Sequence, residues 1–275
     1  MTWRAAYEIT AQVIDDLGEK NAGLISAGVA FYGLFAIFPA IAATIALFGI
    51  FADPVVVDSQ LDLMVGLMPP GVFSLFETQI DGLLAAGGTR LGVATLVSIG
   101  LALWSARSGV AALIRGLNAI FERPNRGSLR HVLVALLLTV CLVGLAIVAL
   151  LMVVVTPVLI AIIPFESNSE LLLEVARWSV AILVLFVGLG MLYRYGPNRR
   201  LERLGWVTPG AFLVVGLWLF MSAAFSVYVA NFSTYNEVYG SIGAVIALLM
   251  WFYLSAYLIL LGGALNVTLD RRKTL

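Results

Sequence analysis

The sequence predicts an all-α polytopic membrane protein with six transmembrane helices and both termini in the cytoplasm. Of its 275 residues, 61% are hydrophobic and only 12% are charged, and the mean hydropathy is +1.03. Soluble domains carry about 25% charged residues, so this composition excludes a soluble enzyme and a disordered tail. Two patterns support the prediction: long stretches without charged residues, and basic residues gathered on one side of those stretches.

Six stretches of the chain lack Asp, Glu, Lys and Arg and are the candidate membrane spans. A bilayer core about 30 Å thick requires roughly 20 apolar residues in a helix. The stretches are residues 21–52, 91–106, 131–165, 178–193, 204–236 and 238–269. The second and fourth are slightly short, but arginines at both ends of each can extend their side chains to the headgroups.

The distribution of basic residues predicts the orientation of the spans. One side carries every Lys and Arg except Arg90 and Arg177: Arg4, Lys20, Arg107, Arg115, Arg123, Arg126, Arg130, Arg194, Arg199, Arg200, Arg203, Arg271, Arg272 and Lys273. Because basic residues concentrate in cytoplasmic loops, we expect this side inside the cell. An even number of spans independently requires both termini on one side.

Four segments outside the spans are expected within one integral membrane domain covering residues 1–275. We expect residues 1–20 to form a cytoplasmic amphipathic lead-in helix. Residues 54–88 predict an outer segment of two short amphipathic helices, either a lid over the bundle or an element that gates a substrate. Residues 107–130 form a basic cytoplasmic connection, and residues 194–203 a basic cytoplasmic loop.

Within the connection, an apolar stripe at helical spacing indicates an amphipathic helix that can continue the second span. The stripe comprises Val110, Leu113, Ile114, Leu117 and Phe121. A basic amphipathic helix of this kind typically binds anionic headgroups at the membrane surface.

Most catalytic chemistry has no counterpart in the sequence. Cys141 is the only cysteine, His131 is the only histidine, and no acidic residue lies in the middle of a predicted span. The chain contains neither a G-x-S-x-G elbow nor a G-x-x-x-x-G-K-[ST] phosphate loop. We therefore expect no catalytic residue, no metal and no cofactor. Membrane topology explains the positions of the arginines, so we expect no nucleic acid partner. We do expect anionic phospholipids to bind at the basic cytoplasmic loops.

Polar residues inside or beside apolar spans are the first candidates for a substrate or lipid site. Tyr32 lies about two turns before Pro39, which is expected to kink the first span. Arg194, Arg199 and Arg200 suit a phosphate-bearing headgroup, although topology alone also explains them.

A second candidate site lies at the outer end of the fifth and sixth spans. It comprises Asn231, Tyr235, Asn236 and Tyr239. These residues form either a substrate or headgroup site, or an interfacial turn in which tyrosines act as membrane anchors.

Small residues recur every four positions in two of the spans. Ser26 and Ala30 lie in the first span, and Ser222, Ser226 and Ala230 lie in the fifth. Such stripes allow helices to approach closely, so we expect these residues to serve helix packing.

Several short motifs run in order along nearly the whole chain. They are S-A-G-V-A-F-Y at 26–32, W-S-A-R at 104–107, Y-R-Y-G-P-N-R-R at 193–200, P-G-A at 209–211, Y-V-A-N-F at 228–232, Y-G-S-I-G-A-V at 239–245 and L-G-G-A-L-N at 261–266. Together they are similar to the YihY/virulence factor BrkB family. The resemblance implies a bacterial inner-membrane protein with six spans and both ends inside.

The resemblance also has limits. The family has carried a ribonuclease BN label, which this sequence does not support because it offers no nuclease machinery. Ala36 and Ala264 stand where the family pattern often has serine and glutamate.

Two functions remain open from the sequence. The first is transport or flipping of a lipid or amphipathic envelope component without an ATPase of the protein's own. The second is a non-transporting scaffold or regulator of envelope integrity. A polar groove favours the first function, and a solid core packed with small residues favours the second. A homo-oligomer is compatible with both.

Overall fold

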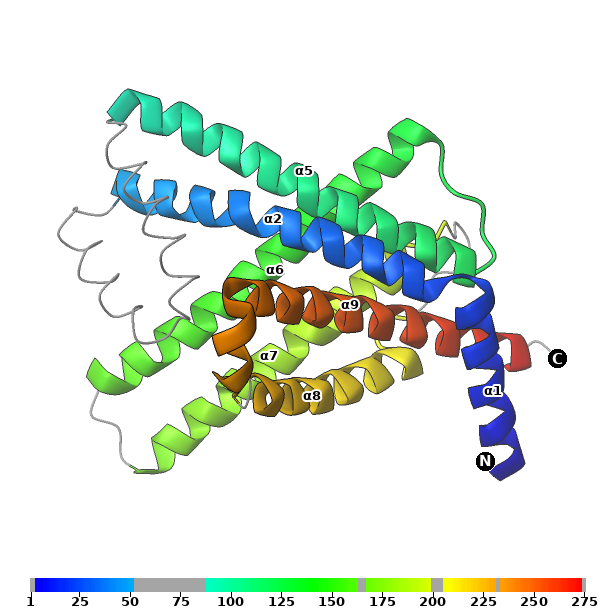
Figure 1. Ribbon diagram of the computed structural model, residues 1–275. Coiled ribbons are helices and arrows are strands. Elements are labelled where there is room, and N and C mark those ends of the chain that lie inside the picture. The colour runs from blue at the N-terminus through cyan, green and yellow to red at the C-terminus, as the bar shows by residue number, and fades with distance from the viewer. Residues whose placement is uncertain (1–2, 52–87, 163–166, 199–204, 231–232, 274–275) are drawn as a thin grey trace. The chain divides into compact units, whose positions relative to one another are not determined.

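The computed structural model describes residues 3–51, 88–162, 167–198, 205–230 and 233–273 (Figure 1). Within these ranges the regular elements are α-helices: α1 (Trp3–Glu19), α2 (Ala22–Phe51), α5 (Gly88–Ile120), α6 (Ser128–Ile162), α7 (Ser167–Tyr195), α8 (Pro209–Ala230) and α9 (Ser233–Lys273). The predicted outer helices within residues 54–88 lie outside the described residues, apart from Gly88, which begins α5.

Five of the described helices are long and apolar enough to cross a membrane. The qualifying stretches are Leu96–Ile120, Ser128–Ala149, Trp178–Tyr195, Pro209–Tyr228 and Val245–Arg272. Helix α1 and the first part of α2 also pass together as one bent pair, which brings the number to six. An all-helical protein with five to six candidate spans agrees with the predicted architecture, and helices suit lipid because they satisfy their own backbone polar groups.

The helix of the second span continues beyond residue 106 into the predicted connection, as its apolar stripe allowed. Helix α5 runs without interruption to Ile120, and the connection to α6 is only residues 121–127. Glu122, directly after the helix, has a positive φ of 50° and marks the turn. Much of the predicted connection is therefore the last part of a long helix.

The apolar stripe in this part of α5 belongs to the protein core. Ile114 and Leu117 are fully buried, and Phe121 is nearly so. A methyl group placed on Gly116, between them, would meet side chains of Ile25 and Leu260. Other helices therefore cover these apolar side chains, and the stripe does not face the membrane surface.

The break between the last two helices lies earlier than expected. Helix α8 ends at Ala230 and α9 begins at Ser233, whereas Asn231 lies outside the described residues. Tyr235, Asn236 and Tyr239 accordingly belong to the first two turns of α9.

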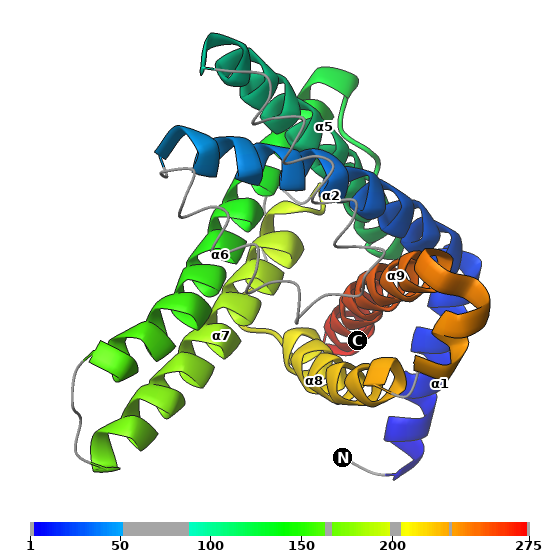
Figure 2. The ribbon, with the colours of Figure 1, turned by 60° about the vertical axis from the view of Figure 1, so that its left-hand side comes forward.

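The described helices form two compact units. Unit 1 comprises α1, the start of α2, α5 from Val110, α6, α7, α8 to Ser222 and α9 from Ser255. Unit 2 contains the remaining parts of α2, α5, α8 and α9. Within unit 1, α6 and α7 lie side by side (Figure 2). A core of Ala111, Ile114, Ala135 and Leu138 joins α5 to α6.

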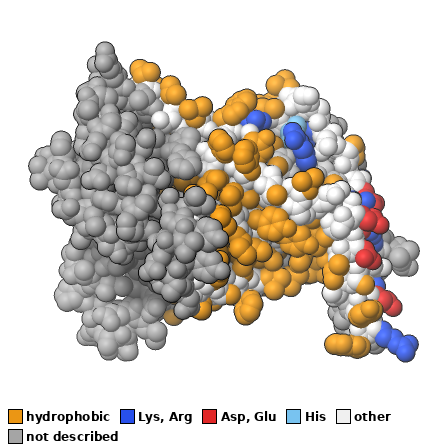
Figure 3. Space-filling view, in the orientation of Figure 1, with side chains coloured by type: hydrophobic (Ala, Val, Ile, Leu, Met, Phe, Trp, Pro, Cys, Tyr) orange, Lys and Arg blue, Asp and Glu red, His pale blue; other side chains and the backbone are white. Residues whose placement is uncertain are grey.

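The lead-in helix forms as predicted and packs against the last helix. Ile9, Val13 and Leu17 make its buried face. Ion pairs link Glu8 to Arg272 at 3.1 Å and Asp16 to Arg271 at 3.4 Å. Figure 3 shows acidic side chains gathered over α1, whereas hydrophobic side chains dominate much of the remaining described surface in that view. Exposed pairs of this kind contribute at most about 1 kcal/mol each, so apolar contacts dominate this packing.

Candidate functional site

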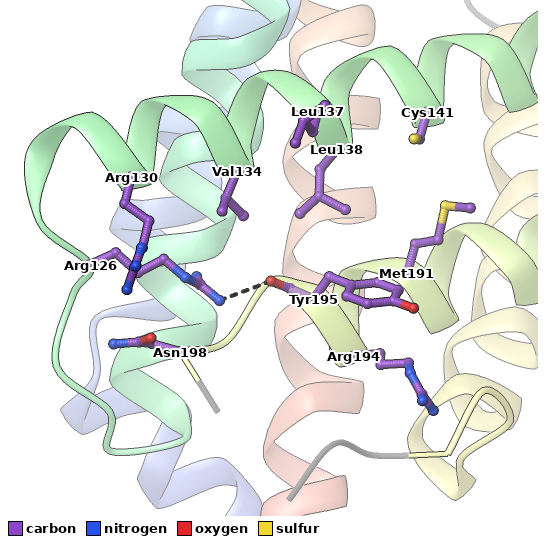
Figure 4. Close-up of a pocket in the computed structure, with 10 residues that line it drawn as sticks. All are labelled: Arg126, Arg130, Val134, Leu137, Leu138, Cys141, Met191, Arg194, Tyr195 and Asn198. Carbon is purple, nitrogen blue, oxygen red and sulfur yellow. Dashed lines mark hydrogen bonds between the residues drawn. The ribbon is translucent and has the colours of Figure 1, made fainter. Parts of the chain in front are cut away.

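Arg126 holds the end of α7 from the turn between α5 and α6. Its Nη1 donates to the carbonyl oxygen of Gly196 at 2.6 Å. Its Nη2 donates to the carbonyl oxygens of Tyr195 at 3.1 Å and Pro197 at 2.8 Å. The last carbonyl groups of a helix have no partner within the helix, so the guanidinium supplies the missing donors. Its positive charge also interacts favourably with the negative end of the helix dipole. Figure 4 shows the bond to Tyr195.

Asn118, in the last turn of α5, joins the same two segments. Its side chain is 1% exposed, and its Oδ1 accepts a hydrogen bond from the backbone N–H of Asn198 at 2.8 Å. Its Nδ2 donates to Oδ1 of Asn125 at 3.0 Å. The Nδ2 of Asn198 in turn donates to the carbonyl oxygen of Pro124 at 3.0 Å. The end of α7 and the α5–α6 turn are thus held together from two sides.

An amphipathic cavity of about 580 Å³ opens beside this junction, between α6 and α7. Its lining comprises Arg126, Arg130, Val134, Leu137, Leu138, Cys141, Met191, Arg194, Tyr195 and Asn198. Figure 4 shows Arg126, Arg130 and Asn198 at one end and Cys141 and Met191 at the other. The cavity therefore presents cations and an amide at one end and apolar or weakly polar side chains at the other.

The cations of the cavity are held in place in different ways. Burial, and then the positive charge of Arg130, lower the pKa of Arg126 from its usual value. Arg130 is exposed and makes no hydrogen bond or ion pair with the described part of the chain. The Arg194 guanidinium lies 5.5 Å from the ring centroid of Trp206 and 5.9 Å from that of Tyr195. Arg126 and Arg130 are close enough to repel each other, and two neighbouring positive charges favour an anionic ligand.

A second polar cluster lies where α8 crosses α9, and this cluster is closed. Asn266 is 3% exposed, accepts a hydrogen bond from the N–H of Gly210 at 2.8 Å and donates to Oγ1 of Thr208 at 3.0 Å. Thr208 caps α8 by accepting from the N–H of Ala211 at 3.2 Å. A methyl group on Gly210 would collide with the carbonyl oxygen of Gly262. These hydrogen bonds join the start of α8 to α9 and cap α8.

The structure describes the side chains of two of the predicted contact residues. Arg194 lines the cavity, whereas Tyr32 is exposed on α2. The remaining predicted contacts are not described at the side-chain level: Pro39, Tyr235, Asn236 and Tyr239 lie within helices, and Arg199, Arg200 and Asn231 lie outside the described residues.

The residues predicted for packing differ in their surroundings. Ser26 and Ala30 are buried in α2, and Ser26 donates to the carbonyl oxygen of Ala22 at 2.8 Å. Ser222 is half-buried, with an Oγ atom that has no hydrogen-bond partner, and Ser226 is exposed. Ala230 ends α8, and its side chain is not described.

The interpretation of the sequence missed Arg126, Asn118 and Asn266 as organisers of these clusters. The charge pattern predicts for Arg126 only a place on the cytoplasmic side. The two asparagines lie in apolar helices, and this isolation was the available signal, because a polar side chain among apolar residues requires a partner.

Comparison with known proteins identifies the family. The model of the family described as Virulence factor BrkB matches residues 13–275. The chain belongs to the virulence factor BrkB family. A Bacillus subtilis protein named "Putative ribonuclease-like protein YfkH" is 36% identical to this BrkB-family chain over 259 residues, which cover 91% of the chain and 90% of the relative.

Other relatives of this BrkB-family protein carry the name UPF0761 membrane protein. One from Xanthomonas oryzae is 36% identical over 102 residues, which cover 37% of the chain and 24% of that protein. One from Idiomarina loihiensis is 32% identical over 93 residues, or 34% of the chain and 32% of that protein. No solved structure matches the chain. These names and the helices together establish a multi-pass membrane protein of the BrkB family.

Proposed function

We propose that this protein transports or flips a lipid or amphipathic envelope component, without an ATPase of its own. The observation that carries the proposal is the cavity between α6 and α7, with Arg126, Arg130 and Arg194 beside apolar side chains. A guanidinium group binds a phosphate through two parallel hydrogen bonds, and the apolar lining suits a hydrocarbon chain. The volume of about 580 Å³ is typical of small-molecule sites.

The proposed setting is the cytoplasmic membrane of a bacterium, with both termini inside. The bias of Lys and Arg toward the α5–α6 turn, the end of α7 and the C-terminus supports this orientation. In that orientation the cavity lies at the cytoplasmic end of α6 and α7, where anionic headgroups of the inner leaflet can reach it.

A flipping assay on reconstituted protein tests the proposal. Vesicles of phosphatidylcholine containing fluorescent phosphatidylglycerol report the fraction of label that an external quencher reaches over time. We expect the wild-type protein to accelerate equilibration and Arg130→Gln to slow it. Arg115→Gln is the matched control, because Arg115 is exposed on α5 and does not line the cavity. Equilibration at the rate of protein-free vesicles would contradict transport of this lipid.

The rival function is a non-transporting scaffold or regulator of envelope integrity. The closed crossing of α8 and α9 favours it, since Gly210 and Gly262 leave no space there for a solute. A protein that retains anionic lipid at the cavity but does not accelerate flipping would support this alternative.

The proposal contains no catalytic step, in contrast to the word ribonuclease in the name of the Bacillus subtilis relative. His131 is the only histidine in the sequence. Within the described ranges, no three residues of His, Cys, Asp and Glu gather as a metal site requires. Incubation of the purified protein with labelled RNA tests this part, and we expect no cleavage above that of a mock purification.

A further inference from the structure

Arg107 lies deep inside the membrane-spanning part of α5. The apolar stretch of this helix runs from Leu96 to Ile120. Asn118 marks the basic end of the stretch, because its side chain binds Asn125 and Asn198 in the two loops there. Arg107 precedes Asn118 by eleven positions, or about 16 Å along a helix axis. That distance is roughly half of a hydrocarbon core about 30 Å thick.

Among the described residues, Arg107 has aromatic and hydroxyl neighbours but no counter-ion. Its guanidinium lies 4.2 Å from the ring centroid of Trp104, and its Nη2 is 3.4 Å from Oγ of Ser108. Its Nε is buried and has no hydrogen-bond partner. No carboxylate pairs with it among the described residues. An unpaired cation in a membrane is costly, and such residues commonly mark the path of a ligand or ion.

An exposed apolar face of α5 leads to Arg107. Val93, Val97, Leu101 and Trp104 recur at helical spacing on one side of the helix, and each is more than half exposed. Gly100, on the same side, has open space around it. This face can accept a hydrocarbon chain that runs along the helix, with a polar group at the level of Arg107.

Tyr32 lies at the same level of the membrane. A methyl group on Gly109 of α5 would lie 3.6 Å from Cβ of Tyr32 on α2. The two helices are thus close at this position, and both residues belong to unit 2. Tyr32 brings a hydroxyl-bearing side chain to a region that otherwise consists largely of apolar groups.

We propose that Arg107 is an intramembrane binding site for the anionic group of an amphiphile, with a phosphate as its ligand. The Nη atoms of the guanidinium group can donate to phosphate oxygens, and the Trp104 ring covers one face of the cation. The inference rests on the proposed function and deepens it, because it adds a position for the headgroup halfway through the bilayer.

Native mass spectrometry of the full chain with bound lipid tests this site. The probes are phosphatidylglycerol, phosphatidylcholine and inorganic phosphate, each offered alone. We expect wild-type protein to retain phosphatidylglycerol and Arg107→Gln to lose at least about tenfold in retention, as for one charge-assisted hydrogen bond. Arg107→Lys should retain an intermediate amount, and Arg115→Gln, eight positions along the same helix, should match the wild type. Retention of phosphate alone would identify a free anion as the source.

Thermal unfolding in a zwitterionic detergent separates binding from a structural role. Without anionic lipid, Arg107→Gln should unfold at the wild-type temperature or above it, because the substitution removes an unpaired charge. A variant that fails to fold, or that unfolds earlier, overturns the proposal.

The two proposals also fail in distinguishable ways. If Arg107→Gln keeps phosphatidylglycerol while Arg130→Gln loses it, the intramembrane site is overturned and the cavity proposal stands. If wild-type protein does not prefer phosphatidylglycerol and does not flip it, both are overturned.

Discussion

Two buried asparagines stand near the ends of membrane helices, but their surroundings differ. Asn118 joins two loops beside a cavity that Arg126, Arg130 and Arg194 line. Asn266 joins two helices at a crossing from which solutes are excluded, with neutral partners only among the described contacts. The difference indicates that buried polarity alone does not mark a ligand site. Arg130 differs from both asparagines, because it is a cation beside open volume and makes no hydrogen bond or ion pair with the described part of the chain.

The largest expected effect concerns the closed crossing. Gly210→Ala places a methyl group against the carbonyl oxygen of Gly262 and against the side chain of Asn266. Helix backbones must separate to accept it, so we expect a loss of about 3 kcal/mol in unfolding free energy, measured by denaturation in detergent. Gly216→Ala is the matched control on α8, since nothing lies within 4 Å of that position. Equal stability of the two variants would contradict close packing at the crossing.

Next in size is the effect of Arg126→Gln at the charged junction. The variant removes donors from the carbonyl oxygens at the end of α7. We expect a loss of about 2 kcal/mol in unfolding free energy and weaker lipid retention, because the cavity wall shifts. If stability is unchanged while retention falls, Arg126 serves the ligand and not the loop.

A smaller effect is expected for Thr208→Ala. The hydroxyl group caps α8 and accepts from Asn266, so its removal leaves two donors without a partner. The expected loss of unfolding free energy is about 1 kcal/mol, the usual value for an N-cap. Lipid retention should not change, which distinguishes this cluster from the cavity. Weaker retention would show that the two regions are coupled.

The smallest effect on stability, and the sharpest test of the comparison, is expected for Arg130→Gln. Arg130 is exposed, so stability should change by less than about 0.5 kcal/mol. Retention of phosphatidylglycerol should fall about tenfold and lose its dependence on salt, because an exposed cation attracts anions through a screened interaction. If Arg130→Gln retains as much phosphatidylglycerol as the wild type at every salt concentration, Arg130 is not part of the site.

The sequence predicted the fold better than the site. Charge-free stretches located the helices, and the amphipathic pattern of residues 1–20 predicted α1. Helix ends were less certain because a polar residue such as Arg107 interrupts the hydropathy signal without ending the helix. The stripe from Val110 to Phe121 suggested a lipid-facing surface, since amphipathicity shows that one face is apolar but does not show what covers it.

The clusters themselves depended on contacts between distant positions. Arg194 was predicted as a headgroup contact and does line the cavity, but Arg126 and Asn118 meet the end of α7 across 70 and 80 positions of sequence. Hydrophobic periodicity reflects neighbouring positions only, so it does not predict contacts between residues this far apart in the sequence.

Composition and hydropathy by themselves determined that this protein is a bundle of membrane-spanning helices. The physical reason is local: in lipid each segment must satisfy its own backbone polar groups, so apolar length alone predicts a helix. Only the tertiary structure decided which polar residues serve the fold. That choice depends on which groups meet, and side chains such as Asn118, Asn266 and Arg126 are satisfied by partners from other helices and loops.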